Sequence, residues 1–107
     1  MSDDPTPEAD VDQLAGAAHD AALVDVREPA EFVQGHVRGA VLMPMGQLAR
    51  RMSELDPRRR VYVICASGNR SRAMTDLLRR AGFEAYSVAG GTQAWIESGR
   101  WVERGPR

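Results

Sequence analysis

One stretch of the chain combines a strand, a cysteine and the start of a helix, and it decides the fold. It reads Val61-Tyr62-Val63-Ile64-Cys65-Ala66-Ser67-Gly68-Asn69-Arg70-Ser71-Arg72. The first four residues are β-branched or aromatic, which predicts a fully buried strand. From about Arg70 onward the pattern is that of an amphipathic helix, whose apolar residues are Met74, Leu77, Leu78 and Ala81. Cys65 is the only cysteine, and it therefore lies where a strand ends and a helix begins.

The position of Cys65 favours a negatively charged sulfur. A loop that leads into a helix N-terminus directs free backbone N–H groups into one small space, and the helix dipole adds partial positive charge there. These surroundings lower the pKa of a thiol below its reference value of about 8.5. We expect Arg70 and Arg72 to act in the same direction if their side chains turn toward the sulfur. The thiolate is the nucleophilic form, so the position predicts attack by sulfur; the alternative is a structural cysteine packed as a small apolar residue.

Three segments resemble the signatures of the rhodanese-like sulfurtransferases. Residues 65–71, Cys-Ala-Ser-Gly-Asn-Arg-Ser, are similar to the active-site loop of that family. Residues 23–40 resemble its first signature, and residues 90–95, with Gly99 beyond them, resemble its last. The resemblance runs from about Leu23 to Trp101, with the segments in the family's order. It implies a three-layer α/β/α fold with the cysteine loop at the carboxyl edge of a parallel sheet.

The pattern along the chain independently predicts an α/β fold, with a parallel sheet of four to five strands and short helices on both faces. Strands are expected at residues 21–25, 41–43, 61–64 and 84–88, and helices at residues 10–18, 29–35, 46–53, 71–81 and from 91 onward. Residues 1–8 are expected to form a flexible arm, and residues 9–104 a single domain. Trp101, in the tail after Gly99, is expected to cover the edge of the core.

Composition and charge exclude several classes of protein. The 107 residues suit one domain, and the net charge of −1 gives no electrostatic case for a nucleic acid or a membrane surface. One cysteine permits no internal disulfide, which suits a reducing compartment, and we expect a cytoplasmic protein. Two histidines and one cysteine, far apart in sequence, do not make a zinc site, so neither a metal nor a cofactor is expected.

The resemblance implies a sulfurtransferase that works through a persulfide on Cys65. The thiolate takes the outer sulfur of thiosulfate or of a persulfide donor, and cyanide or a thiol then removes it. We expect the substrate-binding loop to comprise Ala66, Ser67, Gly68, Asn69, Arg70 and Ser71. Their backbone amides would stabilise the terminal sulfur, and Arg70 would bind a sulfonate or carboxylate of the donor. There is no second cysteine, so the acceptor must be external: a small thiol or a partner protein.

Loop length argues against the nearest rival class of enzyme. Cysteine-dependent phosphatases and arsenate reductases typically place an arginine six positions after the cysteine. Here that position holds Ser71, and the arginines are at positions 70 and 72. The shorter loop resembles that of the family members that handle a single sulfur atom.

A module without catalytic activity, or a sulfur carrier that docks on a partner, is the second hypothesis. Rhodanese-like domains occur in such roles, but inert members often lack the cysteine, and this chain keeps it. The arginines at 58–60 are expected to form a solvated turn rather than a nucleic-acid site, and they are our candidate for a partner surface. Leu42 departs from the family pattern, in which asparagine is frequent at that position.

Several polar residues near the expected site have two interpretations. Asp25 and Arg27 lie at the end of a strand, and we expect a buried ion pair or hydrogen bond that holds loops together rather than a catalytic pair. Glu31 is a candidate partner of Arg27. His36 is expected to fix a turn through its side chain rather than to act as a general base.

Overall fold

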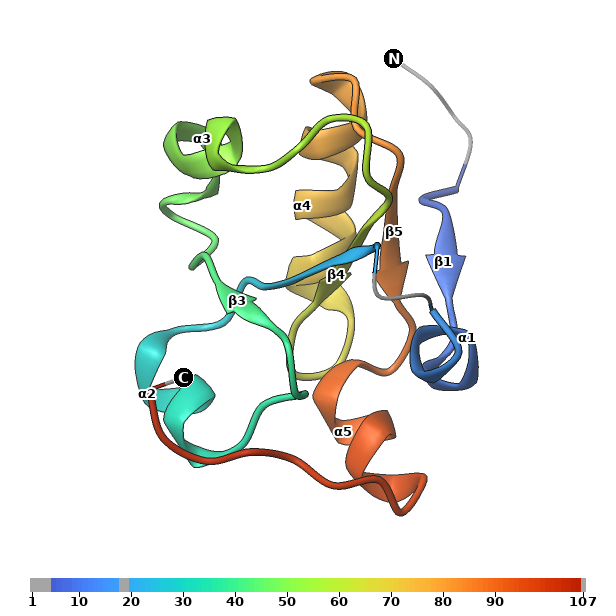
Figure 1. Cartoon of the computed structure of the whole chain (residues 1–107), viewed down its shortest axis with the longest axis vertical. Coiled ribbons are helices and arrows are strands. Elements are labelled where there is room, and N and C mark those ends of the chain that lie inside the picture. Colours follow the sequence, from blue (N-terminus) through green and yellow to red (C-terminus); the bar gives the residue numbers. More distant parts are fainter. Residues whose placement is uncertain (1–4, 18–19, 107) are drawn as a thin grey trace.

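The chain folds around a five-stranded parallel sheet. A computed structural model describes residues 5–17 and 20–106. The strands are β1 (Glu8–Ala9), β2 (Ala22–Asp25), β3 (Val41–Leu42), β4 (Val61–Ile64) and β5 (Ala85–Val88). Their order across the sheet is β1-β5-β4-β2-β3, and every neighbouring pair is parallel (Figure 1). The predicted α/β fold is confirmed, and β4 takes the central place expected for residues 61–64.

The helices begin and end largely where the local signals place them. They are α1 (Val11–Ala15), α2 (Pro29–Gln34), α3 (Leu48–Arg51), a 3-10 turn (Met52–Glu54), α4 (Asn69–Arg80) and α5 (Gly91–Glu97). A capping box between Asp10 and Gln13 opens α1, and Pro29 is the first residue of α2. The Arg51 side chain donates a 3.0 Å hydrogen bond to the Leu42 carbonyl, which ties α3 to the end of β3.

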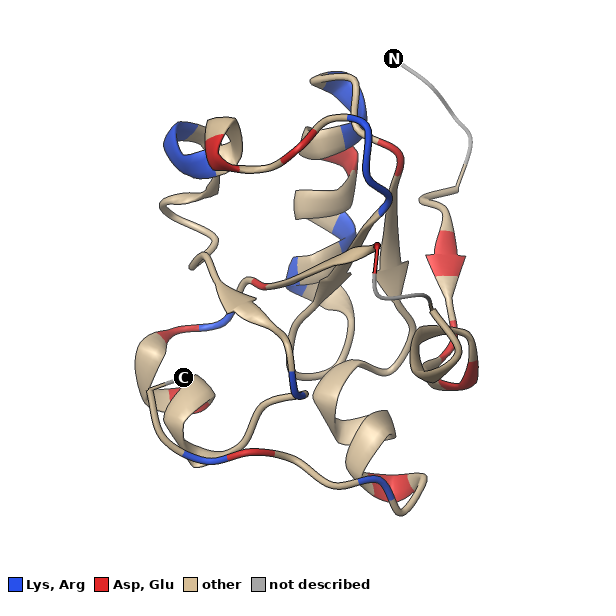
Figure 2. Cartoon of the chain, in the orientation of Figure 1, with Lys and Arg blue, Asp and Glu red and all other residues tan. Residues whose placement is uncertain are grey.

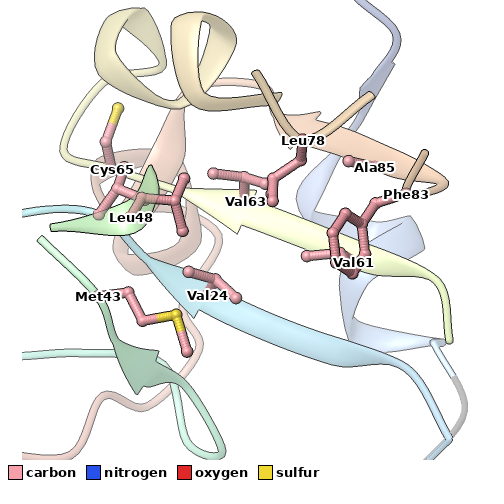
Figure 3. Close-up of a cluster of buried hydrophobic side chains, with 10 residues drawn as sticks. Val24, Met43, Leu48, Val61, Val63, Cys65, Leu78, Phe83 and Ala85 are labelled. Carbon is pink, nitrogen blue, oxygen red and sulfur yellow. The ribbon is translucent and has the colours of Figure 1, made fainter. Parts of the chain in front are cut away.

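Alternation along the strands divides the core between the two faces of the sheet. Val61 and Val63 of β4 pack with Leu78 of α4 and Leu48 of α3 on one face (Figure 3). Tyr62 and Ile64 face the other way, into a cluster that includes Leu14 of α1 and, at its margin, Trp95 of α5. The sheet is therefore the middle of three layers.

Near the two ends of the chain, the described structure differs from what the sequence suggested. Within the expected arm of residues 1–8, Glu8 belongs to β1, and the Pro7 carbonyl accepts a 2.9 Å hydrogen bond from the Ser87 amide; residues 1–4 lie outside the described part. Hydrogen bonding to the edge of β5 orders this segment despite its two prolines. Trp101 covers no core, because it is 92% exposed. The Trp101 carbonyl accepts a 2.8 Å hydrogen bond from the Trp95 indole.

Charged residues are spread over all three layers (Figure 2). The turn at residues 58–60 is exposed, as predicted, and its arginines have local partners: Arg58 pairs with Asp56 at 3.2 Å and Arg60 with Glu84 at 2.7 Å. Within residues 5–17 and 20–106, no helix has both the length and the apolar character that crossing a membrane requires. Over the same residues, no three His, Cys, Asp or Glu side chains come together as a set that could hold a metal ion.

Candidate active site

Cys65 lies at the carboxyl edge of the sheet, directly after β4. The residue is only 1% exposed, and its sulfur points toward the loop that leads into α4 (Figure 3). The backbone turns into the helix at Gly68, whose φ of +114° lies in the left-handed region that favours glycine. The predicted succession of strand, cysteine loop and helix is confirmed.

The loop stabilises a negative charge on the sulfur. The Gly68 amide donates a hydrogen bond to Sγ at 3.1 Å, and the Ser71 hydroxyl lies 3.4 Å from the same atom. Burial of the thiol raises its pKa, but hydrogen bonding with the Ser71 hydroxyl and with the amides of Ser71, Gly68 and Ser67 outweighs the effect of burial, so the pKa of Cys65 lies below its ordinary value. The thiol therefore ionises more readily than an ordinary cysteine, inside a cradle of backbone amides.

A buried chain of hydroxyl groups continues behind the sulfur. Ser71 Oγ lies 2.7 Å from Ser87 Oγ on β5 and donates a 3.0 Å hydrogen bond to the Gly68 carbonyl. Both serines are fully buried. Ser87 was not among the residues predicted for the site. The alternation of residues along β5 places Ser87 on the same face as Ala85, which gave a weak signal that Ser87 is buried. Nothing in the neighbouring sequence indicates that its partner lies on α4.

The start of α5 holds the other side of the loop. The amide of Thr92 donates to the Cys65 carbonyl at 2.9 Å, and that of Gln93 donates to the Ala66 carbonyl at 3.1 Å. Gly91 permits this approach: it has φ +59°, and a Cβ there would clash with the Cys65 carbonyl and would lie 2.6 Å from that of Ala66. The sequence predicted a helix from residue 91 onward but not its contact with the cysteine loop.

The arginines of the loop do not hydrogen-bond to the sulfur. Arg70 forms a two-pronged ion pair with Glu31 of α2, with N–O distances of 2.7 and 2.8 Å. Arg72 lies 3.5 Å from a carboxylate oxygen of Glu8 on β1. The condition stated for the two arginines, that their side chains turn toward the sulfur, is not met by a hydrogen bond, because each side chain pairs with a carboxylate on a neighbouring element. The hydrogen bonds that lower the pKa of Cys65 come from Ser71 and the loop amides.

The polar residues at the carboxyl end of β2 have structural roles. Asp25, fully buried, accepts hydrogen bonds from Arg27 at 2.8 to 3.1 Å, and Arg27 also donates to the Gly35 carbonyl at 2.7 Å. The predicted ion pair is confirmed, but the partner of Arg27 is Asp25 rather than Glu31. His36 bonds the Phe32 carbonyl through Nδ1 at 2.8 Å and stacks on the Phe32 ring, as expected for a residue that fixes a turn.

The remaining predicted loop residues form its outer rim. Ser67 and Asn69 are exposed, and Ala66 is half-buried. A pocket of about 780 Å³ lies elsewhere, against the face of the sheet that carries Tyr62 and Leu23, and none of residues 65–71 lines it. The candidate site is therefore the loop around one almost fully buried sulfur atom, and it is separate from this pocket.

Comparison with known proteins agrees with the fold and the motifs. A sulfurtransferase of Allochromatium vinosum is 36% identical over 88 residues, which cover 81% of this chain and 82% of that protein. An uncharacterized Bacillus subtilis protein, YqhL, is 41% identical over 76 residues, 70% of this chain; the match spans 60% of YqhL.

A solved structure shows the same architecture. The crystal structure of a rhodanese-related protein from Thermoplasma volcanium aligns with a TM-score of 0.85 and 32% identity, over 90% of this chain and 96% of that one. Residues 9–98 match the sequence profile of the rhodanese-like domain. That match covers α1 to α5, β2 to β5 and the cysteine loop, and only Glu8 of β1 lies outside it. The chain therefore belongs to the rhodanese-like domain family.

Proposed function

We propose that this protein is a sulfurtransferase that carries sulfane sulfur as a persulfide on Cys65. The observation that carries the proposal is the cradle around Sγ, where the Gly68 amide lies 3.1 Å from the sulfur and hydrogen bonds lower the thiol pKa. A thiolate held in this way is both a nucleophile and a good precursor of an anionic persulfide.

The first half-reaction moves one sulfur atom onto Cys65. The thiolate attacks the outer sulfur of thiosulfate or of a persulfide R–S–SH. A new S–S bond forms, and the electron pair of the donor's S–S bond leaves with sulfite or with the thiolate R–S⁻. The amides that face Sγ then stabilise the negative charge of the persulfide, as an oxyanion hole stabilises oxygen.

The second half-reaction restores the thiolate. Cyanide or a thiol attacks the terminal sulfur, and the electron pair of the Cys65 persulfide bond returns to Sγ. The acceptor is external, because the chain has no second cysteine. The reaction requires a reduced Cys65, so the proposal places the protein in a reducing compartment such as the cytoplasm, with a small thiol or a partner protein as the acceptor.

Burial of Cys65 limits what enters the site. The residue is 1% exposed, so only the terminal sulfur of a donor reaches Sγ while the rest of the donor stays at the rim formed by residues 66–70. The near-complete burial of Cys65 and the presence of Ser71 at the sixth position after it both favour sulfur over a tetrahedral phosphate or arsenate.

Steady-state kinetics test the proposal. With thiosulfate or a small organic persulfide as donor and cyanide as acceptor, we expect thiocyanate formation and parallel lines in double-reciprocal plots, the sign of a ping-pong mechanism. Cys65→Ser should reduce turnover to background. Thiocyanate formation that survives in Cys65→Ser would refute the persulfide route, and an absence of transfer from every sulfane donor would favour a docking module.

A further inference from the structure

The cation nearest in sequence to the candidate nucleophile is already occupied. Arg70 directs both terminal nitrogens of its guanidinium at the two carboxylate oxygens of Glu31, at 2.7 and 2.8 Å. The pair joins the cysteine loop to the first turn of α2, and about a third of each side chain is exposed (33% and 35%). It therefore lies at the solvent boundary of the site, where a donor's leaving group would arrive.

Glu31 holds Arg70 over the whole working range of pH. The hydrogen bonds from Arg70 lower the pKa of Glu31 to about 2, so the carboxylate is ionised under any condition in which the protein would act. The neighbouring arginines offer little replacement, since Arg27 is buried against Asp25 and Arg72 faces Glu8. An anionic group on a donor must compete with Glu31 for the guanidinium.

We propose that Glu31 determines the donor specificity of this site by withholding Arg70 from anionic leaving groups. The inference builds on the proposed sulfurtransferase function. The favoured donors are then organic persulfides, R–S–SH, whose R group carries no carboxylate or sulfonate close to the sulfur. The reaction is balanced: the Cys65 thiolate takes the outer sulfur, and R–S⁻ leaves with the electron pair of the broken S–S bond. Thiosulfate, whose leaving group is sulfite, is the disfavoured case.

Two donors of equal length and opposite charge separate this effect from a general loss of activity. They are 2-aminoethyl persulfide, with an ammonium group, and 2-carboxyethyl persulfide, with a carboxylate; thiosulfate is the third donor. Glu31→Gln removes the charge but keeps a side-chain oxygen for the 3.1 Å hydrogen bond from the Glu28 amide that closes the start of α2. Glu84→Gln is the matched control, because Glu84 also pairs with an arginine, Arg60. Glu84 directly precedes β5, so it lies at the amino ends of the parallel strands, whereas Cys65 lies at their carboxyl ends.

The expected result is a selective gain for the anionic donors. Glu31→Gln should raise kcat/KM about fivefold for thiosulfate and 2-carboxyethyl persulfide, mainly through a lower KM. The reason is that the Glu31 carboxylate no longer competes with the donor's negative charge for Arg70. It should not raise kcat/KM for 2-aminoethyl persulfide, and Glu84→Gln should change none of the three. Adding Arg70→Gln to Glu31→Gln should abolish the gain, since the freed guanidinium is its cause.

A second variant does not depend on Glu31→Gln. Arg70→Gln alone leaves the Glu31 carboxylate without its partner, and kcat/KM for 2-aminoethyl persulfide should rise while that for the two anionic donors falls. Equal effects on all three donors, in either variant, would overturn the inference while leaving the sulfurtransferase function intact. If the wild-type protein accepts sulfur from none of the donors, the proposed function fails, and this inference fails with it.

Discussion

At the scale of single residues, the acidity of Cys65 depends on hydrogen atoms that can change partner. Ser71 has one hydroxyl hydrogen, and within reach of its oxygen lie the Gly68 carbonyl at 3.0 Å and the Cys65 sulfur at 3.4 Å. When the thiol ionises, this hydrogen can turn to the sulfur, and the Gly68 carbonyl keeps a bond from the Arg72 amide at 3.3 Å. Ser87, 2.7 Å away, then supplies a hydrogen to the Ser71 oxygen.

We therefore expect Ser87→Ala to raise the pKa of Cys65, because the thiolate state loses the donor that supports Ser71. The pH dependence of alkylation by iodoacetamide measures this pKa directly. Thr75→Val is the control: Thr75 is a buried residue of α4 whose hydroxyl has no hydrogen-bond partner in the described part of the chain. An unchanged pKa in Ser87→Ala, or an equal shift in both variants, would contradict this role.

The Glu31–Arg70 pair predicts a specific dependence of stability on acid. The folded pKa of Glu31, about 2, lies below its ordinary 4.5. The ionised carboxylate therefore stabilises the fold above about pH 4.5, and this contribution is lost as the pH falls toward 2. The free energy of unfolding of the wild type minus that of Glu31→Gln should shrink through this window in urea titrations. A difference that stays constant from pH 5 to pH 2 would show that the pair does not stabilise the fold.

At the scale of elements, the cysteine loop is held between the starts of two helices. The amides of α5 bind the carbonyls of Cys65 and Ala66, and Gly91 allows the two backbones to approach. We expect Gly91→Ala to lower the free energy of unfolding by about 2 kcal/mol or more, because the substitution combines a positive φ with a backbone clash. Chemical denaturation measures the loss.

Gly16→Ala provides the comparison for that variant. Gly16 follows α1 with φ −86°, and a Cβ there would make ordinary contacts, the nearest 3.6 Å from the Asp12 carbonyl. Gly16→Ala should leave the free energy of unfolding almost unchanged or raise it slightly. Similar losses in both variants would mean that the contact between α5 and the cysteine loop does not limit stability.

Patterns of neighbouring residues predicted the helices and strands, but they could not predict the contacts between one element and another. The strand predicted at residues 61–64 and the helix predicted near Asp10 depend on neighbours in sequence, and both are confirmed. The pairing of Arg70 with Glu31, 39 positions away, depends on how α2 and α4 are placed, and charge alone could equally assign Glu31 to Arg27. Ser87 reaches Ser71 only because β5 lies beside β4 under α4.

At the scale of the whole molecule, the sheet includes the end of the segment, residues 1–8, that the sequence predicted to be a flexible arm. Acids and prolines before Ala9 obscured β1, whose two residues give almost no periodic signal. Yet Ala9 is 5% exposed, its carbonyl accepts a 2.8 Å bond from the Ala89 amide, and Thr6 donates to Asp76 of α4 at 2.9 Å. This edge strand closes the sheet beside β5.

Removal of residues 1–9 should therefore lower the free energy of unfolding by about 2 kcal/mol, from lost hydrogen bonds and newly exposed apolar surface. Urea unfolding followed by circular dichroism measures it. A truncated protein as stable as the full chain would show that β1 adds nothing to the fold.

The most direct test of the persulfide mechanism is the intact mass of the wild-type protein after exposure to thiosulfate and, separately, to 2-aminoethyl persulfide. We predict a gain of one sulfur atom with at least one donor, loss of that atom on addition of cyanide, and no gain in Cys65→Ser. If folded wild-type protein with a titratable thiol gains no sulfur from either donor, Cys65 does not carry sulfur, and the proposed function is wrong.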